Sequence, residues 1–233
     1  MAPRGIDLGN PFIGSLDGMC ELLLVRHGEQ HFEPEKSLGH NIDAPLSTLG
    51  RRQATAVGER LADIDIHAVY ASPMQRAADT GAAIAGHHGL EIELRPELVE
   101  INLWASLDPG KSLVDSVGAD ELREIYREAG DSRSWDSYRY SEDPAVFRER
   151  VRTSIDGILG AHEGERVAVA CHGGVINAWL SGFFGSPRDM VVSIHHTSIT
   201  TIRGAGERRA VVAVNDYTHV LPFQNALDPL NVA

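Results

Sequence analysis

Four consecutive apolar residues, Leu22 to Val25, constrain the fold of this chain more than any other stretch. A short apolar run without polar alternation is typical of a strand buried on both faces of a parallel sheet. The run stops abruptly at Arg26, His27 and Gly28. Open α/β sheets bind ligands beyond the carboxyl ends of such strands, so a site is expected here. Taken alone, the tripeptide is equally consistent with a histidine that merely packs at a strand end.

Strand and helix patterns alternate along the rest of the chain. Further strands are expected over 64–70, 91–94 and 167–170, and the runs 198–202 and 209–214 flank a glycine-containing turn as in a hairpin. Four helical patterns lie between them. One follows Ser47, one runs from Pro73 (with Ser72 as the cap) to near Gly86, one follows Pro144, and one covers 175–184. This alternation predicts an α/β fold, a three-layer α/β/α sandwich with a mostly parallel central sheet.

The domain organisation follows from where the patterns weaken. We expect a flexible tail over 1–19 and a single domain over 20–233. Within that domain, residues 101–143 lose periodicity apart from one short helix expected over 120–128, so we interpret this stretch as a cap segment inserted over the site. The segment from Gln30 to Pro45 is expected to be a loop. Aromatic and arginine side chains of the cap segment either contact a substrate or pack the segment onto the core.

Composition narrows the classes of partner. A formal net charge of −12 argues against nucleic-acid or anionic-membrane binding, because either would need a basic face. The two cysteines, Cys20 and Cys171, form neither a disulfide framework nor a zinc motif. With no apolar run long enough to span a bilayer, we expect a cytoplasmic protein. A homodimer through the edge strand near 209–214 and a covered edge both remain open.

Chemically useful residues follow several of these strands. Arg26 and His27 follow the first, Arg76 begins the helix after the second, and His172 follows the fourth. Glu100 comes shortly after the third. Because the carboxyl ends of parallel strands meet at one edge, these side chains can share one pocket. Two arginines and two histidines would bind a phosphoryl group through charge-assisted hydrogen bonds.

Motifs around these residues occur in a recognisable order. The chain resembles the histidine phosphatase superfamily, also called phosphoglycerate-mutase-like, in its branch of small phosphatases. The matching pieces are Leu24-Val25-Arg26-His27-Gly28-Glu29, Asp43 to Gly50 with Gln53-Ala54, Ser72 to Ala77 with Thr80, Leu98-Val99-Glu100, His172-Gly173-Gly174, and Asn215-Asp216 with His219.

The resemblance implies roles for individual residues. His27 would be the nucleophile that takes the phosphoryl group as a phosphohistidine. Arg26, Arg76 and His172 would bind the phosphoryl oxygens. His172 would also be a catalytic residue. Glu100 would protonate the leaving oxygen and then activate water. No metal and no cofactor are implied, and the expected partner is a small phosphorylated substrate.

Three positions depart from the family pattern. Glu100 is followed by Ile101-Asn102-Leu103-Trp104-Ala105-Ser106, where the family often has a Phe-Gly-x-Trp-Glu-Gly-like run. Glu33 stands where many members have asparagine. His196 stands near a position where relatives often carry a small polar residue, and the sequence assigns it no role.

The expected function is hydrolysis of a small phosphorylated metabolite by a metal-independent phosphomonoesterase. A phosphoglycerate-mutase-type phosphotransferase is the alternative, but it must exclude water from the phosphoenzyme. Relatives do this with a longer insertion, and Glu100 and His172 are only 72 positions apart. A catalytically weak protein that binds a phosphorylated ligand is the third reading. The presence of both His27 and Glu100 speaks against it, because pure binding needs neither a nucleophile nor an acid.

Overall fold

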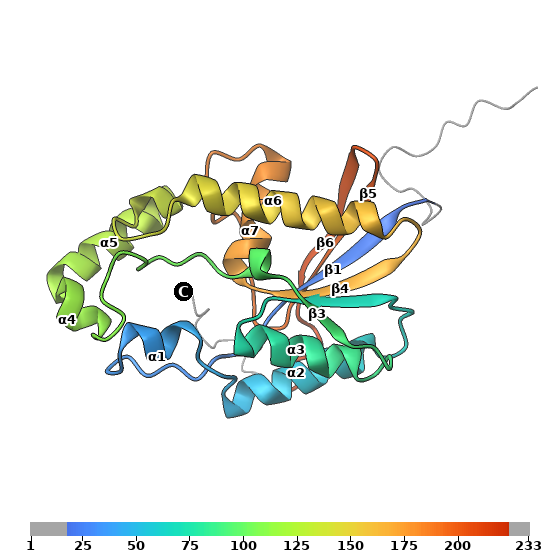
Figure 1. The fold of residues 1–233 in the computed structure, drawn as a ribbon, viewed down its shortest axis with the longest axis horizontal. Coiled ribbons are helices and arrows are strands. Elements are labelled where there is room, and N and C mark those ends of the chain that lie inside the picture. Colours follow the sequence, from blue (N-terminus) through green and yellow to red (C-terminus); the bar gives the residue numbers. More distant parts are fainter. Residues whose placement is uncertain (1–17, 224–233) are drawn as a thin grey trace, which may run out of the picture.

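A six-stranded sheet in the order β3-β2-β4-β1-β5-β6 forms the centre of the computed structural model, which describes residues 18–223 (Figure 1). The strands are β1 (Cys20–Arg26), β2 (Ala68–Ala71), β3 (Ile92–Leu94), β4 (Arg166–Cys171), β5 (Ile199–Ala205) and β6 (Arg208–Asp216). The helices are α1 (Leu38–Ile42), α2 (Thr48–Leu61), α3 (Gln75–Ala85), α4 (Leu113–Val117), α5 (Ala119–Ser132), α6 (Pro144–Ala161) and α7 (Gly173–Phe184), with short 3₁₀ turns η1 (Pro96–Leu98) and η2 (Trp135–Ser137).

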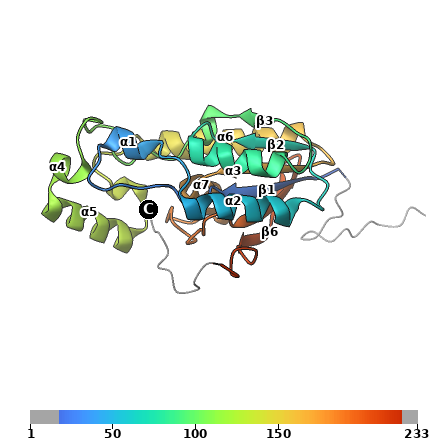
Figure 2. The ribbon, with the colours of Figure 1, turned by 90° about the horizontal axis from the view of Figure 1, so that it is seen from below.

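The two faces of the sheet carry separate apolar cores. Leu22 and Leu24 of β1 point into one core, which α6 and α7 cover, whereas Leu23 and Val25 point into the other, which α2 and α3 cover. Successive strand side chains alternate between faces, so an uninterrupted apolar run fills both cores. Figures 1 and 2 show the helices on either side of the sheet. The predicted three-layer α/β sandwich is confirmed.

The direction of the strands places several chain segments at one edge of the sheet. Strands β1 to β4 pair in parallel, so their carboxyl ends share this edge. Strand β5 runs antiparallel to β1, with Val25 opposite Ile199. The beginning of β5 therefore lies beside the end of β1, and residues just before Ile199 reach the same edge as His27.

The cap segment, residues 101–143, extends beyond the sheet and contains α4 and α5 (Figure 1). Its two ends are joined, because Asn102 N–H donates to Glu142 Oε1 at 2.8 Å and Glu142 N–H donates to the carbonyl of Asn102 at 2.9 Å. Figures 1 and 2 place α1 next to the cap segment, and Leu38 N–H donates to the carbonyl of Lys111.

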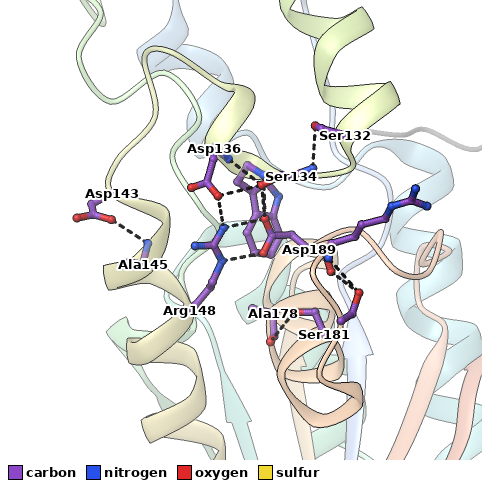
Figure 3. Close-up of polar contacts among 12 residues, drawn as sticks. Ser132, Ser134, Asp136, Asp143, Ala145, Arg148, Ala178, Ser181 and Asp189 are labelled. Atoms are coloured by element: carbon purple, nitrogen blue, oxygen red, sulfur yellow. Dashed lines mark hydrogen bonds and ion pairs between the residues drawn. The ribbon is translucent and has the colours of Figure 1, made fainter.

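A buried carboxylate, in the loop after α7, joins the far side of the cap segment to α6 (Figure 3). Asp189, 5% exposed, accepts hydrogen bonds from the backbone N–H of Trp135 and the hydroxyl of Ser134 in the cap segment. It also pairs with Arg148 of α6 at 2.7 Å. Burial by itself raises the pKa of Asp189. The hydrogen bonds from the guanidinium of Arg148 and the other donors outweigh this effect, so the pKa is lowered.

The structure corrects several local expectations. Helix α3 begins at Gln75 with Met74 at its N-cap, so Ser72 does not cap it; the Ser72 hydroxyl instead accepts from Met74 N–H and contacts His172. The stretch 30–45, expected to be a loop, contains the short α1, and the cap segment contains α4 in addition to a longer α5. The predicted N-cap at Ser47 and the Pro144 start of α6 are confirmed.

Most of the predicted tail, residues 1–17, and the last residues, 224–233, lie outside the described part of the chain. Within residues 18–223, no helix combines the length and apolar character that crossing a membrane requires.

Candidate active site

The side chain of His27 lies just past β1 and is 4% exposed. Its Nδ1 is 2.7 Å from the carbonyl oxygen of Gly28. A carbonyl can only accept, so Nδ1 carries the proton and donates it in this bond. Nε2 therefore keeps its lone pair and accepts a hydrogen bond from Nε of Arg76 at 3.1 Å. The backbone thus selects the tautomer in which Nε2 can act as a nucleophile.

Two glycines allow the loop after β1 to pack directly against the first turn of α2. A Cβ on Gly28 would lie 2.4 Å from the carbonyl oxygen of Gly50. A Cβ on Gly50 would lie 2.0 Å from the carbonyl oxygen of Glu29. The N–H of Gly28 donates to the hydroxyl of Thr80 on α3 at 3.1 Å. Contacts with both helices therefore fix the backbone that orients His27.

Two guanidinium groups lie close to His27. Arg26 donates from Nη1 to the carbonyl of Ile194 at 2.5 Å, while its buried Nε has no hydrogen-bond partner within residues 18–223. Arg76, 5% exposed, also donates from Nη1 to the carbonyl of Ile42 at 2.8 Å. Burial lowers the pKa of Arg26 to about 10, which leaves this side chain charged at neutral pH.

A second imidazole comes from the end of β4. His172 is fully buried at the N-cap of α7, and its ring centroid is 5.0 Å from that of His27. Its Nε2 lies 2.9 Å from the hydroxyl of Ser72. Its Nδ1 is buried and makes no hydrogen bond to the described residues. Buried polar atoms are rarely left unpaired, so Nδ1 of His172 and Nε of Arg26 are available to bind a polar ligand.

Glu100 follows η1 and reaches the first turn of α7. Its Oε2 accepts from the N–H of Gly174 at 3.0 Å, and its Oε1 accepts from the N–H of Ile101 at 3.0 Å. A Cβ on Gly174 would lie 2.2 Å from Oε1, so only glycine leaves space for the carboxyl group. Despite the altered sequence after Glu100, the structure therefore brings this side chain to the same edge of the sheet.

Burial shifts the imidazole and carboxyl pKa values in opposite directions. It lowers the pKa of His27 and of His172 well below the usual value, and the charge of Arg76 adds to both shifts. Burial also raises the pKa of Glu100, although the hydrogen bonds from Gly174 and Ile101 oppose this effect. Neutral imidazoles next to a carboxyl group with a raised pKa are suited to nucleophilic attack with general acid assistance.

The sequence assigns His196 no role, but the ring centroid of His196 lies 5.7 Å from that of His27. It precedes β5, and no strand-end motif marks it. Conversely, Arg139 of the cap segment lies on the surface, where it pairs with the acidic side chains of α5. Glu33 contacts His40 at 2.9 Å and His31 at 3.7 Å, and the side chain of His31 is 61% exposed.

Within the described residues, no group of three or more His, Cys, Asp or Glu side chains is arranged to hold a metal ion. The site instead concentrates two guanidiniums, two imidazoles and one carboxyl group at the edge of the sheet. Fixed cations and N–H donors around a nucleophilic nitrogen can bind a phosphoryl group and stabilise the charge on its oxygens during transfer.

Comparisons with known proteins show which proteins this chain is similar to. The profile of the histidine phosphatase superfamily (branch 1) matches residues 22–217. Phosphoglycerate mutase-like protein 4 of Arabidopsis thaliana is 30% identical over 205 residues, which cover 86% of this chain and 87% of that protein. The metal-independent phosphoserine phosphatase of the same plant is 31% identical over 169 residues, covering 69% of this chain and 67% of that protein.

Solved structures show the same fold. The Bacillus stearothermophilus protein YhfR superposes with a TM-score of 0.70 at 28% identity, covering 86% of this chain and 99% of YhfR. A mycobacterial glucosyl-3-phosphoglycerate phosphatase superposes with a TM-score of 0.69 at 20% identity, covering 84% of this chain and 99% of its own. The profile match spans most of the chain and includes each of the residues that form the candidate site. The chain belongs to the histidine phosphatase superfamily.

Proposed function

We propose that this protein hydrolyses a small phosphomonoester through a phosphohistidine at His27, without a metal ion. The observation that carries the proposal is the hydrogen bond from His27 Nδ1 to the carbonyl of Gly28, which directs the Nε2 lone pair toward the buried donors. Arg26, Arg76 and His172 bind the phosphoryl oxygens. Family membership and the phosphatase names among the relatives support the same chemistry.

The reaction proceeds in two balanced steps. Nε2 of His27 attacks phosphorus, the bond to the ester oxygen breaks, and Glu100 gives its proton to the departing alcohol. Glu100, now a carboxylate, then takes a proton from water as that water attacks phosphorus. The nitrogen–phosphorus bond breaks, inorganic phosphate leaves, and both side chains return to their starting states. The raised pKa of Glu100 suits this alternation between acid and base.

The relatives named phosphoglycerate mutases favour a second candidate, phosphoryl transfer between hydroxyl groups of a phosphoglycerate. Both reactions need the same phosphohistidine and differ in whether water or a second hydroxyl accepts the group. We favour hydrolysis because Glu100 and His172 are only 72 positions apart, which is short for a water-excluding cover between them.

The test compares wild type, His27→Ala and the exposed-loop control His31→Ala on a panel of phosphomonoesters in the presence of a chelator. The panel includes phosphoserine, 3-phosphoglycerate and glucosyl-3-phosphoglycerate, and each reaction is assayed for free phosphate and for phosphoglycerate isomers. We expect phosphate release that survives the chelator and the control substitution but disappears in His27→Ala. Isomer formation without phosphate release would establish the mutase, and ligand binding without either product would leave only a binding protein.

A further inference from the structure

A third imidazole lies beside the nucleophile, and the two-step reaction above does not use it. The ring of His196 is tilted by 48° to that of His27, with the centroids 5.7 Å apart. The residue is 9% exposed, so it is almost completely withdrawn from solvent. Within residues 18–223, its ring makes no hydrogen bond. An imidazole that is almost completely withdrawn from solvent and makes no hydrogen bond has its ring nitrogens available to bind a ligand.

The backbone that presents His196 is held in a strained conformation. Thr197, the next residue, has a φ of 55°, in the left-handed region that β-branched residues rarely adopt. Its N–H donates to the carbonyl of Arg26 at 3.0 Å, and Arg26 in turn donates to the carbonyl of Ile194 at 2.5 Å. Arg26 therefore makes hydrogen bonds to this segment on both sides of His196. Such strain persists where surrounding contacts enforce it, and it is concentrated at functional sites.

Strand β6 and the residue after it make further contacts with the segment that contains His196. Asn215, itself at a φ of 61°, accepts from the N–H of His195 at 2.8 Å and donates to the carbonyl of Ser193 at 2.9 Å. The ring of His195 stacks on Tyr217 with a centroid separation of 3.8 Å. The neighbouring histidines thus have different partners: His195 packs on β6-side residues, and His196 packs against His27.

Electrostatics determine the form of the His196 imidazole. Burial, followed by the charge of Arg26, lowers the pKa of His196 to about 2, so the ring is neutral. A neutral imidazole always retains one N–H donor. Next to Arg26 and Arg76, such a donor can bind an oxyanion without adding a third, repelling cation to the buried site.

We propose that His196 is a further catalytic residue, a neutral donor whose ring N–H binds an oxygen of the phosphoryl group carried on His27. This inference rests on the proposed function. A phosphoryl group on Nε2 places its oxygens within a few ångströms of the His27 ring, and a ring whose centroid lies 5.7 Å from that of His27 is within reach of such an oxygen. His196 would therefore complete, from the start of β5, the set of donors that the ends of the parallel strands provide.

The test measures both binding and turnover in His196→Ala, His196→Asn and the adjacent control His195→Ala. Binding is followed by titration with orthovanadate, which mimics the transferring phosphoryl group, and turnover by kcat and KM with para-nitrophenyl phosphate. Loss of one hydrogen bond to a charged oxygen should weaken vanadate binding about tenfold to a hundredfold in His196→Ala, with a matching fall in kcat/KM. Asparagine keeps an N–H donor and should restore most of the loss, while His195→Ala should stay within about twofold of wild type.

Two results would overturn the proposal. Vanadate affinity within about twofold of wild type in His196→Ala would show that the ring does not touch the anion. Equal losses in the alanine and asparagine variants, together with a lowered Tm, would assign His196 a packing role only. Because vanadate binding needs no turnover, it separates the two proposals. Binding that depends on His196 in a protein that hydrolyses no ester would refute the proposed function alone, and a wild type that binds no vanadate would refute the role of His196.

Discussion

Acidification should destabilise this protein because the folded chain keeps buried imidazoles neutral. The pKa values of His27, His172 and His196 are all lowered, chiefly by burial. In the unfolded chain each imidazole binds a proton near pH 6.5, whereas in the folded chain it does not, so stability is lost as pH falls below 6.5. Between pH 7 and pH 5, a group that stays neutral throughout in the folded chain lowers the free energy of unfolding by about 2 kcal/mol, since one proton per pH unit corresponds to about 1.4 kcal/mol.

Substitution of one histidine isolates its share of this loss. In His172→Asn, the difference between the free energies of unfolding at pH 7 and pH 5 should shrink by about 2 kcal/mol, whatever the substitution does to stability at either pH. Urea unfolding followed by tryptophan fluorescence at the two pH values measures this difference. The matched control is His31→Asn, because the His31 side chain is 61% exposed and meets water in both states. An unchanged pH difference in His172→Asn would mean that folded His172 takes up a proton despite the nearby guanidiniums, and the argument from burial would fail.

Three further substitutions test other contacts. Gly174→Ala should displace the Glu100 carboxyl group, because Oε1 lies 2.2 Å from the position of the new Cβ. It should therefore lower kcat more than tenfold with little change in vanadate affinity. Normal turnover would show that the carboxyl group does not need this space. Wild-type kcat should fall as pH rises through the raised pKa of Glu100, because the general acid then loses its proton. Glu100→Gln cannot ionise, so it should abolish this fall and lower kcat about 10²- to 10⁴-fold. A pH–rate profile of the variant that still falls at high pH would assign the fall to another group. Glu21→Ala should cost about 3 kcal/mol in urea unfolding, because Glu21 is 5% exposed and pairs with Arg166 and Arg203, and a cost below about 1 kcal/mol would show that water replaces these pairs.

The parts of the site that the sequence predicted share one physical signature. His27 and His172 each follow an apolar run without alternation, which is typical of a strand buried on both faces. The carboxyl ends of parallel strands meet at one edge, so the two histidines could be expected together from topology. The structure places their ring centroids 5.0 Å apart.

What the sequence missed has no such signature. His196 lies just before the antiparallel β5, and strand-end motifs mark only residues that follow a strand. The start of α3 was misplaced because the hydroxyl of Ser72, read as a helix cap, lies 2.9 Å from His172, a partner that is 100 residues away in the chain. Helix α1 spans five residues, too few for an apolar period to be visible.

The paired ends of the cap segment, Asn102 and Glu142, have an evolutionary consequence. Two backbone N–H groups join these residues across the base, so the intervening chain leaves and returns at one point. Residues can be gained or lost between them without shifting the strand ends that hold His27 and His172. A lineage that keeps this base and the anchor at Asp189 can exchange one cap for another and inherit the phosphoryl chemistry unchanged. Selection can therefore act on the length and sequence of this segment separately from the strand ends.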